Sequence, residues 1–167
     1  MIISKYILMT MENHRVYLYI IEEIAKQNSL TIEYYKGEWL DLYKMLEQGQ
    51  IDLLPDMAFT KYRDSLFCFN KLFVINSWLE VYVHINSDIE KIKDLNNKKI
   101  GVLMSSHQQE YLTNQFSKDF DIKYELVLFE SYKQTTHALI RGDVDAIVAS
   151  RFYSFSDEYS SQISSTV

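Results

Sequence analysis

Two stretches of the chain share one pattern of apolar and polar positions. Residues 39–63, WLDLYKMLEQGQIDLLPDMAFTKYR, place apolar residues at helical spacing as far as Leu46, then a turn at Gly49 and the apolar run Ile51–Leu54. Residues 136–151, THALIRGDVDAIVASR, repeat this order. Each copy predicts a helix, a turn and a buried strand that ends in polar residues. We therefore expect two similar α/β lobes that face each other across a cleft.

The rest of the pattern predicts the other elements. The polar run 12–14 predicts a turn, Thr60 is expected to cap a short helix, and Ser105 or Ser106 caps a helix that runs to Phe116. Alternation makes 76–85 a long strand that crosses between the lobes. Further strands are predicted at 2–11, 30–35, 99–103, 122–129 and 144–149, and helices at 16–27, 88–95 and 132–141.

These elements divide the chain into three parts. We expect lobe 1 over residues 1–78 and lobe 2 over residues 79–152. Residues 153–167 are polar and rich in serine, which predicts either a solvated tail or the start of a return to lobe 1.

Composition restricts the function. The chain has 167 residues, of which 47% are hydrophobic, and can bury a core. A net charge of -6 argues against nucleic acid as a partner. No stretch is apolar for the roughly 18 residues that a membrane helix needs, and no signal peptide follows Met1. The single cysteine, Cys68, cannot form an internal disulfide.

The polar residues after the two buried strands are candidates for ligand contact. In open α/β sheets the ligand crevice lies beyond the carboxyl ends of the strands, and the first such end carries Asp56, Thr60 and Arg63. Arg63 either binds a ligand or is a helix-surface charge that pairs with Asp64 or Asp56. The helix start at Ser106 offers free N–H groups to an anion.

Other residue types add little chemistry. Trp39 is expected to anchor the core, and Trp78 either packs there or forms a wall of the cleft. The four histidines lack metal-binding spacing, and no nucleophile elbow, phosphate loop or dinucleotide fingerprint is present. We therefore predict no catalytic residues, no metal and no cofactor.

Five motifs in one order carry a family resemblance. They are GQIDLLPDMAFTKYR, FCFN, NSWLEVYV, DLNNKKIGVLMSS and GDVDAIVASR. In this order the chain, from about residue 20 to residue 153, resembles the family-3 extracellular solute-binding proteins, closest in pattern to the sensor domains of histidine kinases. The resemblance implies an α/β, two-lobed fold of the type II periplasmic-binding-protein kind.

The resemblance also implies roles for residues. Thr60 and Arg63 match a Thr-x-x-Arg motif whose arginine pairs with a ligand carboxylate, because a planar guanidinium binds carboxylate with two hydrogen bonds. Ser105 and Ser106 match the turn that holds the same anion from the opposite lobe. Ser150 stands where amino-acid binders usually carry an acid that pairs with the ligand ammonium. An ordinary α-amino acid is therefore a doubtful ligand.

Three further implications concern structure. Asp52 and Asp145 match a recurring aspartate that we expect to support the turn without touching ligand. The usual first strand is compressed or missing before Val16, and family members continue beyond the position of Val167. We therefore expect a domain truncated at both ends, whose exposed strand edges would favour a homodimer.

The function expected from this resemblance is the non-catalytic binding of a small anionic or zwitterionic solute by lobe closure. We expect an extracytoplasmic sensor domain, periplasmic or at the cell surface, in a membrane-anchored histidine kinase of a two-component signal transduction system. One alternative is a free-standing solute-binding protein of an importer. Another is an enzyme similar to cyclohexadienyl dehydratases, with Glu110 or His107 as the acid or base.

Overall fold

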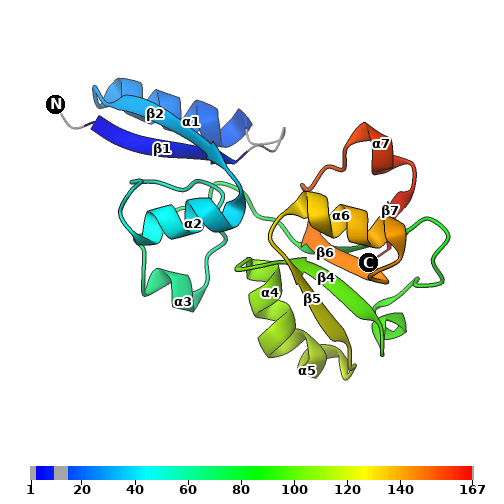
Figure 1. Ribbon diagram of the computed structural model, residues 1–167. Helices are drawn as coiled ribbons and strands as arrows, with labels where there is room; N and C mark the ends of the chain where they lie inside the picture. The colour runs from blue at the N-terminus through cyan, green and yellow to red at the C-terminus, as the bar shows by residue number, and fades with distance from the viewer. Residues whose placement is uncertain (1–2, 10–14, 167) are drawn as a thin grey trace. The chain divides into compact units, whose positions relative to one another are not determined.

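The computed structural model describes residues 3–9 and 15–166 of the chain, and Figure 1 draws their helices and strands. They form two compact units, which divide between Asn76 and Ser77. Each unit combines parallel strands with helices, so the predicted α/β class is confirmed. The turn predicted at 12–14 lies outside the described residues.

The first unit is built on a parallel pair of strands. Strand β1 pairs with β2 over its whole length, with Ile3 opposite Thr31. Parallel neighbours need a crossover connection, and α1, which lies between β1 and β2 in sequence, packs alongside β2 (Figure 1). The predicted helices and strands of this unit are thus present except for the strand at 51–54. Its elements are β1 (Ile3–Met9), α1 (Arg15–Gln27), β2 (Thr31–Gly37), α2 (Trp39–Glu47) and α3 (Lys61–Asp64).

The buried strand predicted over Ile51–Leu54 is wrong. Only Leu53 forms a bridge, and the residues around it are irregular. Pro55 has no N–H to donate, and the chain turns at Asp56, where φ is 61°. The ends of the run, Ile51 and Leu54, are nevertheless 2% and 7% exposed. The apolar run thus indicated burial, which an irregular segment can also provide.

The second unit is built on a mixed sheet with strand order β5-β4-β6-β3-β7. Strands β5, β4 and β6 run parallel, and β3 is antiparallel to both of its neighbours. The strand predicted over 76–85 is present as β3, which lies entirely within this unit. The strands are β3 (Leu79–His84), β4 (Lys99–Leu103), β5 (Glu125–Phe129), β6 (Ala146–Ser150) and β7 (Ile163–Ser165).

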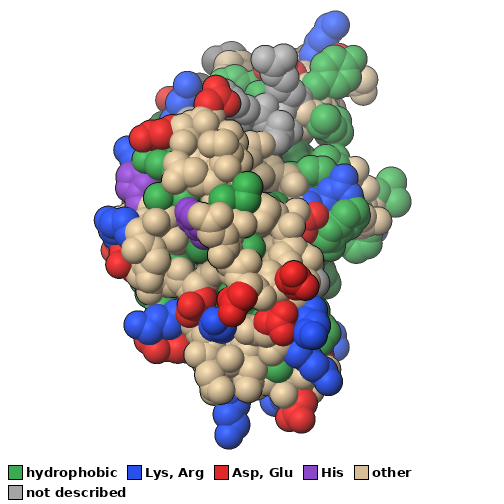
Figure 2. Space-filling model, turned by 90° about the vertical axis from the view of Figure 1, so that its right-hand side faces the viewer, with side chains coloured by type: hydrophobic (Ala, Val, Ile, Leu, Met, Phe, Trp, Pro, Cys, Tyr) green, Lys and Arg blue, Asp and Glu red, His purple; other side chains and the backbone are tan. Residues whose placement is uncertain are grey.

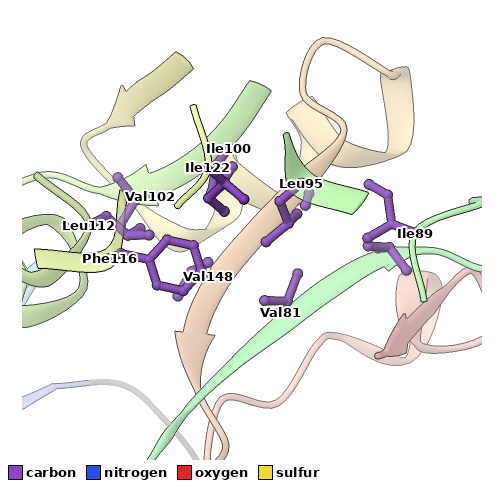
Figure 3. Close-up of a cluster of buried hydrophobic side chains, with 11 residues drawn as sticks. Val81, Ile89, Leu95, Ile100, Val102, Leu112, Phe116, Ile122 and Val148 are labelled. Atoms are coloured by element: carbon purple, nitrogen blue, oxygen red, sulfur yellow. The ribbon is translucent and has the colours of Figure 1, made fainter. Parts of the chain in front are cut away.

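Buried side chains cover both faces of this sheet. Val81 and Val83 of β3 belong to one apolar cluster, whereas Tyr82 belongs to another, as the alternation of a strand requires. The first cluster, shown in Figure 3, also takes Leu112 and Phe116 from the segment after β4. The second takes Ala138, Leu139 and Ile163, among others, from the elements on the other face. Two cores hold the sheet in place from opposite sides.

The helix predicted to run from Ser106 to Phe116 has three segments. It begins as α4 (His107–Tyr111), widens into the π-helical turn η2 (Leu112–Phe116) and ends as α5 (Ser117–Phe120). Asp121, with a φ of 50°, ends it in the left-handed conformation. The local irregularity leaves Leu112 and Phe116 buried in the first cluster.

Two other predicted helices differ from each other in outcome. Helix α6 (Tyr132–Arg141) has the predicted bounds and ends at Gly142, where φ is 74°. The helix predicted over 88–95 is reduced to the 3₁₀ turn η1 (Ile92–Leu95). The Asp94 carboxylate accepts hydrogen bonds from the N–H groups of residues 90 and 91, each at 3.1 Å, and thereby caps the turn at its start.

The polar segment 153–167 contains two elements. Helix α7 (Asp157–Ser160) is followed by β7, which pairs antiparallel with β3, Ser164 opposite Val83. Ile163 is the apolar residue that anchors this strand, because it is 8% exposed and belongs to the second cluster. The described part of this segment therefore packs against the second unit.

Candidate functional site

Three strands of the second unit bring polar residues to one edge of the sheet. Strands β4 and β6 are parallel neighbours, so their carboxyl ends lie at the same edge. Strand β3 runs the other way and begins there, with Leu79 opposite Ser150. We call the residues at this edge the strand-end cluster: Ser77, Trp78, Ser105, Ser106, Ser150 and Arg151.

Ser106 caps α4 and is buried, with 5% of its surface exposed. Its Oγ accepts a hydrogen bond from the N–H of Gln109 at 3.1 Å and donates to the carbonyl of Leu103 at 2.6 Å. Ser105 precedes it at a φ of 57°, and its N–H donates to Gln109 Oε1 at 2.6 Å. The predicted cap is confirmed. The hydroxyl proton of Ser106 is already donated to Leu103. Ser106 could therefore bind an anion, as predicted, only through backbone N–H groups or after its hydroxyl rotates away from Leu103.

Gln108 and Tyr132 extend this edge. Gln108 is 7% exposed, and its Nε2 donates to the Tyr132 hydroxyl at 3.1 Å. Tyr132 stacks on Tyr153 at 4.5 Å between ring centroids, and the Tyr153 hydroxyl lies 2.9 Å from Thr136 Oγ1. Burial raises the pKa of Tyr153. Sequence reasoning missed this network, because the pair Gln108–Tyr132 joins the starts of two helices that are 24 residues apart.

Side chains next to the start of β3 contact side chains at the end of β6. Ser77 Oγ and Ser150 Oγ lie 2.9 Å apart. The guanidinium of Arg151 lies 3.8 Å from the centroid of the Trp78 ring, whose Nε1 donates to Glu80 Oε1 at 3.1 Å. Trp78 is 56% exposed, so the alternative in which it packs in the core is wrong, and its role as a wall of the cleft stays a prediction.

The first unit contributes a buried arginine. Thr60 Oγ1 accepts the N–H of Arg63 at 3.1 Å, which confirms Thr60 as the cap of α3. The Arg63 side chain is 3% exposed, and its Nη1 donates to the carbonyl of Ala58 at 3.0 Å. Its guanidinium carbon lies 5.4 Å and 5.8 Å from the centroids of the Trp39 and Tyr43 rings. The surface position that the alternative gave to Arg63 is therefore wrong, whereas its pairing with Asp64 or Asp56 stays a prediction.

Asp56 is held near the same turn. Tyr17 of α1 forms a side-chain hydrogen bond with it, and the pKa of Tyr17 is raised well above its ordinary value. The main cause is burial, which disfavours the phenolate, and the negative charge of Asp56 adds to it.

The part of the chain that the structure describes brings together no group of three or more His, Cys, Asp or Glu side chains that could hold a metal ion. Among residues 3–9 and 15–166, no helix is both long and apolar enough to cross a bilayer. Figure 2 shows acidic and basic side chains interspersed on the face that it presents.

Known proteins resemble the chain in sequence and in fold. A family profile described as NMT1/THI5 like matches residues 74–156. A protein of Bacillus subtilis named probable amino-acid-binding protein YxeM is 27% identical to this chain over 133 residues. The aligned part covers 79% of this chain and 49% of YxeM. The chain thus spans about half the length of this curated relative.

Solved structures agree on the fold. An arginine transport-system periplasmic binding protein from Legionella pneumophila superposes with a TM-score of 0.79 at 18% identity, covering 98% of this chain and 79% of that one. A histidine kinase sensor domain with similarity to periplasmic binding proteins gives 0.78 at 16% identity, covering 98% and 76%. The chain has the type II periplasmic-binding-protein fold. The predicted resemblance of this type II domain to the family-3 solute-binding proteins is likewise confirmed.

The fold distributes the predicted site residues of the type II domain between its units. Thr60 and Arg63 belong to the first unit, and the strand-end cluster, which holds the other four, belongs to the second. That the two groups close on one ligand stays a prediction. Asp145 has the supporting role expected from the resemblance, since its carboxylate accepts the N–H of Lys99 at 2.7 Å and ties β6 to β4.

Proposed function

We propose that this chain is an extracytoplasmic domain that binds a small anionic or zwitterionic solute by lobe closure. The observation that carries the proposal is the buried guanidinium of Arg63. A cation removed from water is costly unless charge or hydrogen bonds compensate for it. The carbonyl of Ala58 and the aromatic faces of Trp39 and Tyr43 hold the guanidinium in place. A ligand carboxylate would match its charge and the two-pronged geometry that a guanidinium favours.

The strand-end cluster supports a second set of contacts. The turn at Ser105 and Ser106 is fixed by the cap bonds to Gln109, so its backbone does not have to order when a ligand arrives. Trp78 is exposed and offers an aromatic face for a wall of the pocket. Arg63 and Thr60 would hold the anionic group from one lobe, and this edge would engage it from the other.

Closure follows from differential affinity. A ligand that contacts both units binds the closed arrangement more tightly than the open one and shifts the population toward it. Small-angle X-ray scattering with and without bound solute measures this shift as a smaller radius of gyration. A radius that does not change when the ligand is bound would argue against closure.

Ligand binding could serve either of two processes, signalling through a kinase or import of the solute. The similarity to a histidine kinase sensor domain supports a sensor in a membrane-anchored kinase. The name of the Legionella protein, which describes a transport system, supports a receptor that feeds an importer. A full-length protein in which solute changes autophosphorylation would establish the sensor. Loss of solute uptake on deletion of the gene, with no kinase sequence adjoining this chain, would establish the receptor.

Isothermal titration calorimetry tests the binding site. The panel is succinate, glutarate, butyrate, glutamate, glutamine and arginine, and the variants are Arg63→Lys and Arg63→Ala. Arg63→Lys keeps the positive charge but loses the planar guanidinium that donates two hydrogen bonds to a carboxylate. Hydrogen bonds to charged groups contribute about 1.5–3 kcal/mol, so this variant should bind about tenfold or more weakly.

The matched control is Arg141→Ala. Arg141 is 65% exposed at its side chain and pairs with Asp143 at 2.7 Å, away from the strand ends. Its removal should leave the affinity unchanged. Circular dichroism must show that each Arg63 variant is folded. Equal affinity in folded wild type and Arg63→Lys would remove Arg63 from the site.

A further inference from the structure

The register of β3 and β6 places an acid and a base on one face of the sheet at the strand-end edge. The two strands are antiparallel, and the N–H of Arg151 donates to the carbonyl of Trp78 at 3.1 Å, so these two residues lie opposite each other. Opposite residues of an antiparallel pair point to the same face, as does every second residue of a strand. Glu80 and Tyr82 therefore share the face of Trp78 and Arg151.

Glu80 is an acid that its neighbours hold in a defined position. Its Oε1 accepts a hydrogen bond from Trp78 Nε1 at 3.1 Å. Tyr82 forms a side-chain hydrogen bond with the same residue, and its hydroxyl lies 3.3 Å from the carbonyl oxygen of Ser150, which competes for its single proton. A carboxylate can accept about four hydrogen bonds, so Glu80 keeps the capacity to accept from a ligand.

Arg151 is held by aromatic rings beside this acid. Its guanidinium carbon lies 3.8 Å from the centroid of the Trp78 ring and 4.8 Å from that of Phe152. A guanidinium stacked on a ring keeps the N–H groups in its own plane able to donate edge-on. Both Trp78 and Arg151 are exposed, so these donors can be reached from solvent.

The two charges stand apart although both contact one indole. The ion pairs formed among residues 3–9 and 15–166 include neither Glu80 nor Arg151. Trp78 instead holds the carboxylate at the edge of its ring and the guanidinium over its face. Because both charges touch the same ring, one small molecule can reach them together.

Such a pair of charges discriminates between ligands. A zwitterion can donate from its ammonium group to Glu80 and accept from Arg151 with its carboxylate, and both hydrogen bonds are charge-assisted. A dicarboxylate would bring a like charge to Glu80, and a diamine would bring one to Arg151; both contacts are unfavourable. A monocarboxylate would leave the acid without a partner of opposite charge.

We propose that Glu80 accepts the ammonium group of a zwitterionic solute and that Arg151, stacked on the same indole, donates to its carboxylate. This inference rests on the proposed function and names the residues that select the ligand charge. It uses side chains of the second unit alone and does not depend on Arg63. Trp78 is the positioning residue, because it holds both charged groups.

Calorimetry with two pairs of ligands tests the subsite. Glutamate and glutarate differ only in an ammonium group on the α-carbon, and 4-aminobutyrate and butyrate differ only in one at the far end of the chain. In at least one pair the amino compound should bind wild type about tenfold or more tightly than its partner. The pair that shows this preference tells whether the two charges of the solute are adjacent or separated.

Variants assign the preference to its residues. Glu80→Gln keeps an acceptor for Trp78 and loses the charge, so it should remove the preference without weakening the binding of glutarate or butyrate. Arg151→Gln should weaken the amino compound by about tenfold or more. Trp78→Leu should reduce the preference, because it frees both charged groups. Circular dichroism must show that each variant is folded.

Two control variants make the same changes elsewhere in the second unit. Glu125→Gln lies at the first residue of β5, which is parallel to β4, so it stands at the edge opposite to the strand-end cluster. Arg141→Gln removes a cation that pairs with Asp143 at 2.7 Å. Both variants should keep the preference for the amino compound.

The outcomes separate this inference from the proposed function. Glutarate and butyrate that bind as tightly as their amino counterparts would overturn the subsite, as would a preference that survives in folded Glu80→Gln. An equal loss of affinity for every ligand in Glu80→Gln would also overturn it, because removal of a charge must affect the amino compounds selectively. In each of these cases the solute still binds and the proposed function stands. Only if no ligand of the full panel or of these pairs bound wild type would the proposed function fail with it.

Discussion

Replacing Ser106 with alanine should destabilise the second unit whether or not a ligand is bound. The substitution removes the cap bond from Gln109, which is 3.1 Å long, and a cap of this kind contributes about 1 kcal/mol. It also removes the donor that lies 2.6 Å from the buried carbonyl of Leu103, which costs about 1 kcal/mol more. We therefore expect the free energy of unfolding to fall by about 2 kcal/mol.

Thermal and urea denaturation followed by circular dichroism measure this loss. For a domain of about 60–100 residues, 1 kcal/mol corresponds to about 4–8 °C, so the melting temperature should fall by about 8–16 °C. The matched control is Ser131→Ala at the start of α6. That hydroxyl also caps a helix, accepting the N–H of Gln134 at 3.3 Å, and its loss should cost about 1 kcal/mol. The difference between the two variants isolates the bond to Leu103.

A second variant separates structure from ligand contact. Ser106→Thr keeps the hydroxyl and should keep most of the stability. If the free energy of unfolding of Ser106→Ala lay within about 0.5 kcal/mol of the wild-type value, the hydroxyl would not hold the turn. The reasoning from the two hydrogen bonds would then be refuted.

Two further predictions concern packing and pH. Gly101→Ala should lower the free energy of unfolding by about 1–3 kcal/mol, because the added Cβ would lie 3.1 Å from side-chain carbons of Ile147 and Phe129. An unchanged midpoint in urea denaturation would show that these neighbours can move aside. Burial, together with the hydrogen bond to Glu22, raises the pKa of Tyr34 to about 12. Unfolded tyrosine releases its proton near pH 10, so this contribution to stability is complete below about pH 10 and is lost as the pH rises through 12. Tyr34→Phe should flatten that part of the stability profile, and a wild-type profile that is already flat there would contradict the assignment.

Local chemistry made several elements predictable from the sequence. Thr60 and Ser106 cap helices through bonds to residues three positions later. Helix α6 has the predicted bounds because its apolar spacing ends at Gly142, the residue that adopts the left-handed conformation most easily. Strand β4 was also predicted to the residue, since its apolar run lies between polar neighbours. In each case the deciding interactions lie within a few positions along the chain.

Other features depend on residues that are distant in sequence. The apolar run 51–54 is buried without forming a strand, and the polar segment after Ser154 gains β7 because an edge of β3 is there to pair with it. The charge of Arg63 is buried against Trp39, which lies in another helix. None of these outcomes follows from local spacing.

The sequence by itself determined the order of most helices and strands, the caps that start two of the helices, and the resemblance to solute-binding proteins. Only the tertiary structure placed Ser77 beside Ser150, 73 residues later, and stacked Arg151 on Trp78. The physical reason is register. Which side chains meet across β3 and β6 is decided by the alignment of two strands that the whole sheet and both of its cores hold in place.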